Sequence, residues 1–275
     1  MQKVIPYKKQ ALEIENPKER LSFVKELFSS GEVKFSQIER LNLLKDLLKG
    51  ERAYLLSCGP TLLDHGTEKL NSLTGENLTF AIKQSYDLFS KNVDVHFYNC
   101  ANYKNYDYGN NPPIVFEAST NPTGVGKEHD VRFLIKERNF NNSVSSTGDF
   151  QSWTFEKQPF LRPYGPGIMY EIVFFAIQHL GINEVITIGW DNKLINKDAA
   201  KQHFYDMSET KFDKKDFIHQ NEVAQNVKVE NLEYEAKITS EAITPFYFWL
   251  RENDCELKIV SELNPAPKFI ERVTL

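Results

Sequence analysis

The sequence between residues 53 and 63 reads Ala53-Tyr54-Leu55-Leu56-Ser57-Cys58-Gly59-Pro60-Thr61-Leu62-Leu63. Its first half is a short apolar run, which is typical of a buried strand. After Gly59-Pro60-Thr61, apolar residues recur at the spacing of an amphipathic helix. Open α/β sheets bind their ligands outside the carboxyl ends of their strands, where the chain turns into a helix. This stretch therefore predicts an α/β sheet with a nucleotide site at the turn.

The same alternation of strands and helices continues along the chain from Glu51. Apolar runs predict further strands at residues 78–84, 93–99, 114–118, 131–136, 184–189 and 256–260, and helices at 62–73, 167–180 and 231–253. Apolar strands that alternate with helices are typical of parallel sheets. We therefore expect an α/β fold with a Rossmann-like, doubly wound, mainly parallel sheet over residues 51–275.

Residues 1–50 are strongly charged and carry apolar residues at helical spacing, in two groups: Leu21, Val24, Leu27 and Phe28, and then Ile38, Leu41, Leu44, Leu47 and Leu48. We expect a helical extension, ended by Gly50 as a C-cap. Two interpretations remain open, because the extension could pack on the main domain or on a partner chain in a homo-oligomer.

Composition narrows the classes of partner. The chain has 275 residues and a net charge of −5, which argues against a general affinity for nucleic acid or anionic lipid. Its three cysteines, Cys58, Cys100 and Cys255, are widely spaced, so a disulfide framework is not expected and a reducing cytoplasm is favoured. The start of the sequence has no apolar core typical of a signal peptide, and no window is long enough to span a membrane. Peripheral membrane contact stays open.

The turn after the first strand can bind an anion. Gly59 permits close approach of a phosphate, and the start of the following helix offers free N–H groups. Thr61 is placed to act as the N-cap or to direct its hydroxyl to a phosphate. The alternative is an ordinary strand-to-helix turn capped by Thr61. We do not expect Cys58 to act as a nucleophile, because the sequence identifies no paired histidine.

Polar residues also follow the later strands. Lys83 could meet a phosphate or carboxylate as a point charge, and the amide of Asn99 could read a ribose or base edge. Asp191, in Gly189-Trp190-Asp191, could take ribose or sugar hydroxyls. The alternatives are a solvated lysine, a turn-forming asparagine and an aspartate that caps the next element.

A second turn rich in glycine stands before the helix at 167–180. In Arg162-Pro163-Tyr164-Gly165-Pro166-Gly167, the glycines offer backbone N–H groups, and Arg162 can hold a carboxylate or phosphate with two hydrogen bonds. We expect Arg162, Gly165, Pro166 and Gly167 to contact the ligand.

Three stretches together resemble a known group of proteins. The first is Leu56-Ser57-Cys58-Gly59-Pro60-Thr61-Leu62, the second is Phe80-Ala81-Ile82-Lys83-Gln84-Ser85-Tyr86 with Phe97-Tyr98-Asn99, and the third runs from Gly165-Pro166-Gly167 to Leu180-Gly181-Ile182-Asn183-Glu184-Val185-Ile186-Thr187-Ile188-Gly189-Trp190-Asp191. Their order and spacing resemble bacterial sialyltransferases that use CMP-sialic acid, the motility-associated flagellin glycosyltransferase-like proteins and an archaeal-type hydroxymethylpterin pyrophosphokinase. The likeness covers residues 54–205, with a faint echo at Ser261–Asn264.

The resemblance implies an inverting, metal-independent glycosyltransferase that uses a CMP-activated nonulosonic acid, or a related nucleotide sugar, and a glycan or protein acceptor. It implies no cofactor beyond this co-substrate and no metal. It assigns donor contacts to the three motifs, at Cys58, Gly59, Pro60, Thr61, Lys83, Gln84, Asn99, Arg162, Gly165, Pro166, Gly167 and Asp191. Tyr205 resembles a family tyrosine that orients a phosphate.

The resemblance points to His203 as the base that deprotonates the acceptor hydroxyl, with Asp206 and His219 as alternatives. The chain departs from the family pattern where Cys58 and Lys83 each replace an asparagine, Pro166 a serine and Met207 the second histidine. Two other functions stay open for these reasons. One is a Mg²⁺-dependent pyrophosphoryl transferase, and the other is a non-catalytic nucleotide-binding relative.

Overall fold

The computed structural model describes residues 2–99, 106–119, 129–134, 169–191, 203–206 and 229–275. Its centre is a sheet of seven strands in the order β5-β4-β3-β2-β1-β6-β7, and every pair is parallel. The strands are β1 (Arg52–Leu56), β2 (Thr79–Ile82), β3 (Val95–Asn99), β4 (Ile114–Ser119), β5 (Val131–Leu134), β6 (Glu184–Ile188) and β7 (Glu256–Ile259). The expected parallel α/β sheet is confirmed.

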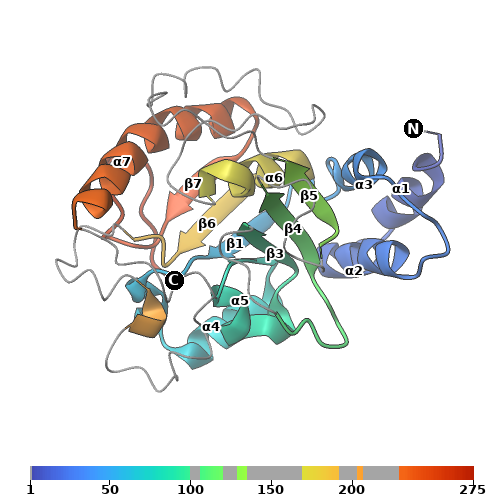
Figure 1. Ribbon diagram of the computed structural model, residues 1–275, viewed down its shortest axis with the longest axis horizontal. Helices are drawn as coiled ribbons and strands as arrows, with labels where there is room; N and C mark the ends of the chain where they lie inside the picture. The colour runs from blue at the N-terminus through green and yellow to red at the C-terminus, as the bar shows by residue number, and fades with distance from the viewer. Residues whose placement is uncertain (1, 100–105, 120–128, 135–168, 192–202, 207–228) are drawn as a thin grey trace.

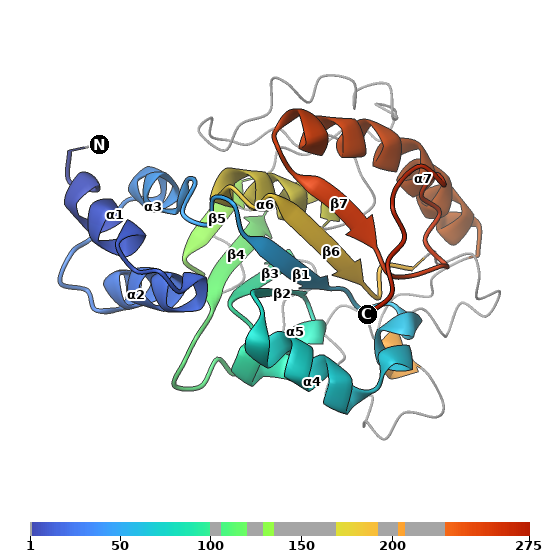
Figure 2. The same cartoon turned by 180° about the vertical axis from the view of Figure 1, so that it is seen from behind.

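Helices cover both faces of this sheet (Figures 1 and 2). One face carries α4 (Thr67–Glu76), α5 (Ser85–Phe89) and the short η2 (Ser90–Asn92). The other face carries α6 (Phe174–Leu180), which continues a π-helical turn at Met169–Val173, and α7 (Val229–Glu252). Helices on two faces of a parallel sheet make the fold doubly wound and Rossmann-like, as expected.

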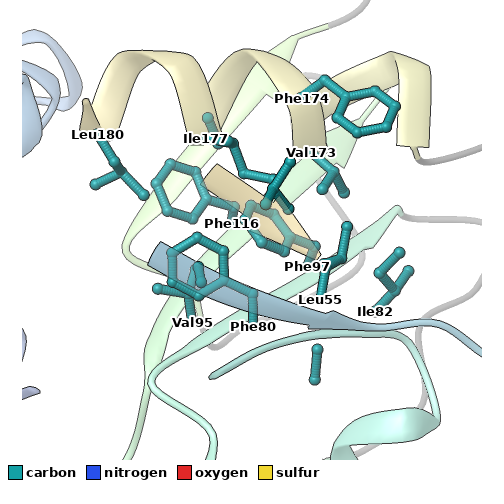
Figure 3. Close-up of a cluster of buried hydrophobic side chains, with 14 of the residues drawn as sticks. Leu55, Phe80, Ile82, Val95, Phe97, Phe116, Val173, Phe174, Ile177 and Leu180 are labelled. Atoms are coloured by element: carbon teal, nitrogen blue, oxygen red, sulfur yellow. The ribbon is translucent and has the colours of Figure 1, made fainter. Parts of the chain in front are cut away.

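The main core lies between the sheet and α6 (Figure 3). Side chains of alternate strand residues point to this layer because successive side chains of a strand face opposite sides. Leu55, Phe80, Phe97 and Phe116 from four neighbouring strands meet Ile177 of α6 there, and all five are buried. The rings of Phe97 and Phe116 stack with centroids 5.3 Å apart. This layer packs four neighbouring strands against α6.

The helix expected at residues 62–73 is two helices. The 3-10 helix η1 spans Pro60–His65, and α4 begins at Thr67 after Gly66, whose φ is +77°. A residue at positive φ cannot continue a right-handed helix, and glycine adopts this conformation without steric strain. Gly181 also has a positive φ, +83°, but it adopts the left-handed helical conformation, and it ends α6 as the sequence predicted.

The first fifty residues form three helices, α1 (Ile5–Leu12), α2 (Pro17–Ser29) and α3 (Gln37–Leu44), at one end of the sheet (Figure 1). Asn16 caps α2, and Ser36 with Glu39 forms a capping box on α3. Gly50 is not the C-cap we expected. The helix α3 ends at Leu44, and Gly50 N–H instead donates to Gly181 O (3.2 Å) and Asn183 Oδ1 (2.7 Å).

The helical extension packs on this chain's own sheet through buried charges. Asp130, just before β5, accepts from Val115 N–H (2.8 Å) and Lys25 Nζ (2.7 Å), and its backbone carbonyl accepts from Arg40 (2.8 Å). Asp94, just before β3, accepts from Thr79 N–H (2.8 Å) and pairs with Lys18 (3.4 Å). The extension therefore neutralises carboxylates at the amino edge of the sheet.

No helix within the described ranges is both long and apolar enough to cross a membrane.

Candidate functional site

The candidate site begins where the strand order reverses. From β1 the chain proceeds outward through β2, β3, β4 and β5, and then returns to place β6 and β7 on the other side of β1. Ligands of open α/β sheets bind at such a switch point, outside the carboxyl ends of the strands. Here the turn after β1 and the turn after β6 meet, and these carry the Gly59-Pro60-Thr61 and Gly189-Trp190-Asp191 sequences.

Asp191 joins three strand ends. Its Oδ2 accepts from Thr61 N–H (2.8 Å), and its Oδ1 accepts from the Thr61 hydroxyl (2.6 Å) and from the Ser261 hydroxyl beyond β7. The carboxylate therefore occupies the amino end of η1, where a free N–H group and the helix dipole favour an anion. The expected role of Thr61 as N-cap is wrong, because Gly59 holds the N-cap position and Thr61 follows Pro60 inside the helix.

Gly59 approaches β6 rather than open space. Its N–H donates to Gly189 O (2.8 Å), and a Cβ at Gly59 would lie 2.4 Å from both Gly189 O and Asp191 Oδ2. Gly189 has a φ of +69°, and a Cβ there would lie 2.8 Å from Leu62 Cβ. Both glycines are required because the turns after β1 and β6 pack in direct contact.

Cys58 and Gln84 lie together at the ends of β1 and β2. The Cys58 thiol donates to Ile82 O (3.1 Å) and lies 3.9 Å from Gln84 Oε1. Gln84 is 1% exposed, and within the described ranges its Nε2 has no hydrogen-bond acceptor. A buried amide that leaves both N–H groups unsatisfied costs about 1–3 kcal/mol, so this group requires an explanation.

Strain accompanies this amide. Lys83, directly before Gln84, has a backbone φ of +49°. This conformation is uncommon for residues other than glycine, asparagine and aspartate. Two bonds to β3 hold it there, because Lys83 N–H donates to Phe97 O (2.8 Å) and His96 Nε2 donates to Lys83 O (2.9 Å). The other nitrogen of His96 lies 2.9 Å from the Tyr108 hydroxyl. Sequence analysis did not single out this histidine, which is fully buried in the middle of an apolar strand.

The segment around His203 returns to β1. Phe204 N–H donates to Cys58 O (2.9 Å), which brings the short η6 (Phe204–Asp206) to the candidate site. The His203 and Tyr205 rings stack, with centroids 4.8 Å apart and planes 5° apart. His203 is half-buried and Tyr205 is buried. Residues that lie almost 150 positions apart in the sequence thus share one strand end.

The other predicted site residues are placed only in part. Asn99 is the last residue of β3 and pairs with Ala118 of β4, which puts its backbone at the same edge of the sheet. Arg162, Gly165, Pro166 and Gly167 lie outside the described residues, as do the alternative base His219 and the substituted Met207.

Two other kinds of reactive site, a cysteine nucleophile and a metal centre, were considered among the described residues. Burial raises the pKa of the Cys255 thiol to about 12, so this cysteine is not a nucleophile near neutral pH. Within the described ranges, no three histidine, cysteine, aspartate or glutamate side chains gather closely enough to hold a metal ion.

Comparisons with known proteins yield a distant structural likeness. No protein-family model matches the chain, and no curated protein matches it. One similar solved structure is a mammalian sialyltransferase in complex with Gal-beta-1-3GalNAc-ortho-nitrophenol, at 10% sequence identity and a TM-score of 0.36. The match covers 94% of this chain and 85% of that chain. At this TM-score the likeness supports no argument about function, and the fold assignment rests on the parallel sheet itself.

Proposed function

We propose that the protein is a glycosyltransferase that binds a nucleotide sugar at the carboxyl ends of β1 and β2. The donor is a CMP-activated nonulosonic acid or a related nucleotide sugar, and the reaction is inverting and independent of metal. The observation that carries this proposal is the enclosed Gln84 amide, whose Nε2 meets no acceptor within the described residues. The resemblance of the surrounding stretch to CMP-sialic-acid-dependent enzymes supports the choice of donor.

Gln84 would read the nucleotide. Its Nε2 can donate to an acceptor on the base or ribose, while its Oε1 faces the Cys58 thiol 3.9 Å away. The strained backbone at Lys83 is consistent with this role, because strain that the fold maintains is often found at binding sites. Asn99 ends the adjacent strand β3 and would complete the nucleotide contacts.

The phosphate would lie away from the amino end of η1. Asp191 already fills that position, and a second anion there would be repelled by the carboxylate. Arg162 and the Gly165–Gly167 turn, as the resemblance implies, would hold the charged part of the donor instead. Thr61 and Asp191 then support the site by joining β1, β6 and β7.

His203 would act as the base. It lies next to β1 through Phe204, and stacking on Tyr205 fixes its ring orientation. In an inverting transfer, a base removes the proton of the acceptor hydroxyl while this oxygen attacks the anomeric carbon from the side opposite to the leaving nucleotide. The bond to the CMP phosphate oxygen breaks as the new glycosidic bond forms.

Calorimetry with CMP, UMP and ATP, each with and without Mg²⁺, tests the binding step. We expect CMP to bind without Mg²⁺, and Gln84→Leu to weaken this binding about tenfold, because one buried hydrogen bond is lost. Gln178→Leu is the matched control, since Gln178 bonds Asn253 at the surface and lies beyond the candidate site. Binding of ATP only with Mg²⁺ would instead favour the pyrophosphoryl transferase, and no binding of any nucleotide would end the proposal.

Turnover tests the chemical step. We expect slow hydrolysis of CMP-N-acetylneuraminic acid, and His203→Gln to reduce it at least a hundredfold while CMP affinity is unchanged. CMP binding without any hydrolysis or transfer would favour the non-catalytic relative.

A further inference from the structure

Glu117 stands in the same row of the sheet as the proposed nucleotide site. Pairing across the sheet places Glu117 of β4 beside Tyr98 of β3 and Arg132 of β5. One residue before Tyr98, Phe97 pairs with Ile82, so the Tyr98 row continues to Lys83 at the end of β2. Leu56 pairs with Ala81, and the row therefore ends near Cys58. The sheet thus carries a line of residues from Cys58 to Glu117 at its carboxyl edge.

The Glu117 side chain is buried, and only one of its two carboxylate oxygens has hydrogen-bond partners among the described residues. It is 0% exposed, and its Oε2 accepts from Arg132 Nε (2.8 Å) and lies 3.3 Å from His129 Nδ1. The other oxygen, Oε1, has no hydrogen-bond partner in the part of the chain that the structure describes. An ionised carboxylate accepts hydrogen bonds through both oxygens, so leaving one bare in a dry interior is unfavourable.

Asp130 shows what a carboxylate with a purely structural role looks like in the same pair of strands. It lies at the amino side of β5, and its Oδ2 accepts from both Val115 N–H and Lys25 Nζ at 2.8 and 2.7 Å. Arg40 adds a third positive or polar group within 3.9 Å of Oδ1. Glu117 differs because Arg132 and His129 contact only its Oε2, and its Oε1 has no hydrogen-bond partner among the described residues.

We propose that Glu117 Oε1 binds a hydroxyl group of the sugar in the nucleotide sugar and so selects a polyhydroxylated donor. This inference rests on the proposed function. Three strand spacings separate Glu117 from Cys58, which is about 14 Å. A carboxylate that far from the nucleotide end of the site lies where the sugar of an extended donor would reach.

The charge of Glu117 decides which part of the sugar it meets. A carboxylate only accepts hydrogen bonds, so its partner must donate, as a hydroxyl does. It repels the carboxylate of a nonulosonic acid, and therefore favours the hydroxyl-rich end of that sugar. Arg132 Nε lies 2.8 Å from the other oxygen, Oε2, and holds the carboxyl group in place, so Glu117 would position the sugar.

The test compares two probes, CMP and CMP-N-acetylneuraminic acid, by calorimetry on the full chain. The dissociation constant of CMP divided by that of CMP-N-acetylneuraminic acid, here called the ratio, measures the affinity that the sugar adds. In Glu117→Gln, the amide oxygen keeps the bond to Arg132 and an NH₂ group replaces Oε1. We expect CMP affinity to stay unchanged and the ratio to fall about tenfold, because a charge-assisted bond is lost.

Two further variants separate binding from folding. Glu117→Asp keeps the charge but withdraws the oxygen by one methylene, and we expect the same loss in the ratio. Asp130→Asn, at the neighbouring structural carboxylate, should lower stability and leave the ratio unchanged. An unchanged ratio in both Glu117 variants overturns this inference alone, as does a sugar that adds no affinity to the wild type. Failure of CMP to bind the wild type overturns the proposed function as well.

Discussion

The amino edge and the carboxyl edge of this sheet treat their buried polar groups differently. At the amino edge, Asp94 and Asp130 each accept a backbone N–H and pair with a lysine of the helical extension. At the carboxyl edge, Gln84 and Glu117 are more deeply buried, yet each keeps an atom with no partner within the described ranges. Two exceptions lie at the amino edge within the described ranges. Arg40 Nε has no hydrogen-bond partner there, although the same guanidinium donates to Asp130 O, and Glu184 Oε1 has no hydrogen bond, although it pairs with Arg52.

This difference indicates that the polar groups of the amino edge stabilise the fold, and that those of the carboxyl edge are available to bind a ligand. Groups that are satisfied within the chain hold the extension to the sheet, whereas unsatisfied buried groups reduce stability unless a ligand completes them. Ligand sites of parallel sheets lie at the carboxyl edge for a topological reason, since the turns there diverge at the switch point. The contrast leads to four predictions, in order of decreasing effect.

The largest effect is expected at Asp130. Asp130→Ala removes the partner of Lys25 and leaves Val115 N–H without an acceptor, so we expect the free energy of unfolding to fall by about 3–5 kcal/mol. Urea unfolding followed by circular dichroism measures this loss. Glu32→Ala, at an exposed position between α2 and α3, serves as the control and should change stability by less than about 0.5 kcal/mol. A loss below 1 kcal/mol for Asp130→Ala would show that the contacts of this carboxylate do not stabilise the amino edge of the sheet.

Asp94 should make stability depend on pH. Burial raises the pKa of its carboxyl from 3.8 to about 6, although Lys18 opposes the rise. The folded state then binds the proton more tightly than the unfolded state, so the free energy of unfolding decreases as pH rises from about 4 to about 6. The difference in pKa corresponds to a decrease of up to about 3 kcal/mol.

Asp94→Asn isolates this contribution, because asparagine retains an oxygen for Thr79 N–H but does not titrate. The difference in melting temperature between the wild type and this variant should shift in favour of the variant between pH 4 and pH 6. A constant difference over that range would show that Asp94 titrates normally.

Gly59→Ala should disturb the contact between the turns after β1 and β6. The added methyl would lie 2.4 Å from Gly189 O, which is a backbone atom and cannot rotate away. We expect a loss of about 1–3 kcal/mol in the free energy of unfolding, measured by urea titration. Gly75→Ala is the matched control, because the nearest atom to its Cβ is Asn92 Nδ2 at 3.9 Å and Gly75 lies within α4. That variant should be unchanged or more stable by up to about 1 kcal/mol.

The smallest effect, with the opposite sign, is expected at Gln84. Gln84→Leu removes an amide that lacks a partner in the described part of the chain, so the ligand-free protein should keep its stability or gain up to about 1 kcal/mol. Thermal and urea unfolding without nucleotide measure this change. A loss above 2 kcal/mol would mean that the amide is satisfied within the protein, and the carboxyl edge would then resemble the amino edge.

Local sequence patterns predicted the strands well. Each predicted strand overlaps an observed one, because a strand buried on both faces requires a run of apolar residues, and such a run is visible in one short window. Predictions at turns were less accurate. The break at Gly66 and the end of α3 at Leu44 depend on single backbone angles and on contacts with Gly181 and Asn183, which no local pattern contains.

In the candidate site, too, local sequence predicted some features, whereas others depended on contacts between distant segments. The small residues at 59–61 indicated a special turn, and Asp191 was one of the predicted site residues. The sequence offered an aspartate that either binds a ligand or caps the next element, and only the tertiary structure showed that its carboxylate bonds Thr61 at the amino end of η1, an earlier element. Glu117 and His96 gave no signal at all, because a polar residue inside an apolar strand is indistinguishable from an outward-facing one until both faces of the sheet are covered.

Local residue patterns were sufficient to predict that this chain forms a parallel α/β sheet with a turn of small residues after its first strand. Periodicity and glycine placement are local properties, and they limit the backbone wherever they occur. Which polar groups have hydrogen-bond partners depends on the folded arrangement of distant segments. The tertiary structure brought Asp191 to Thr61, His203 to Cys58 and Arg132 to Glu117, and it enclosed Gln84. A hydrogen bond requires two groups within about 3 Å, and for residues far apart in the chain only the folded arrangement sets that distance.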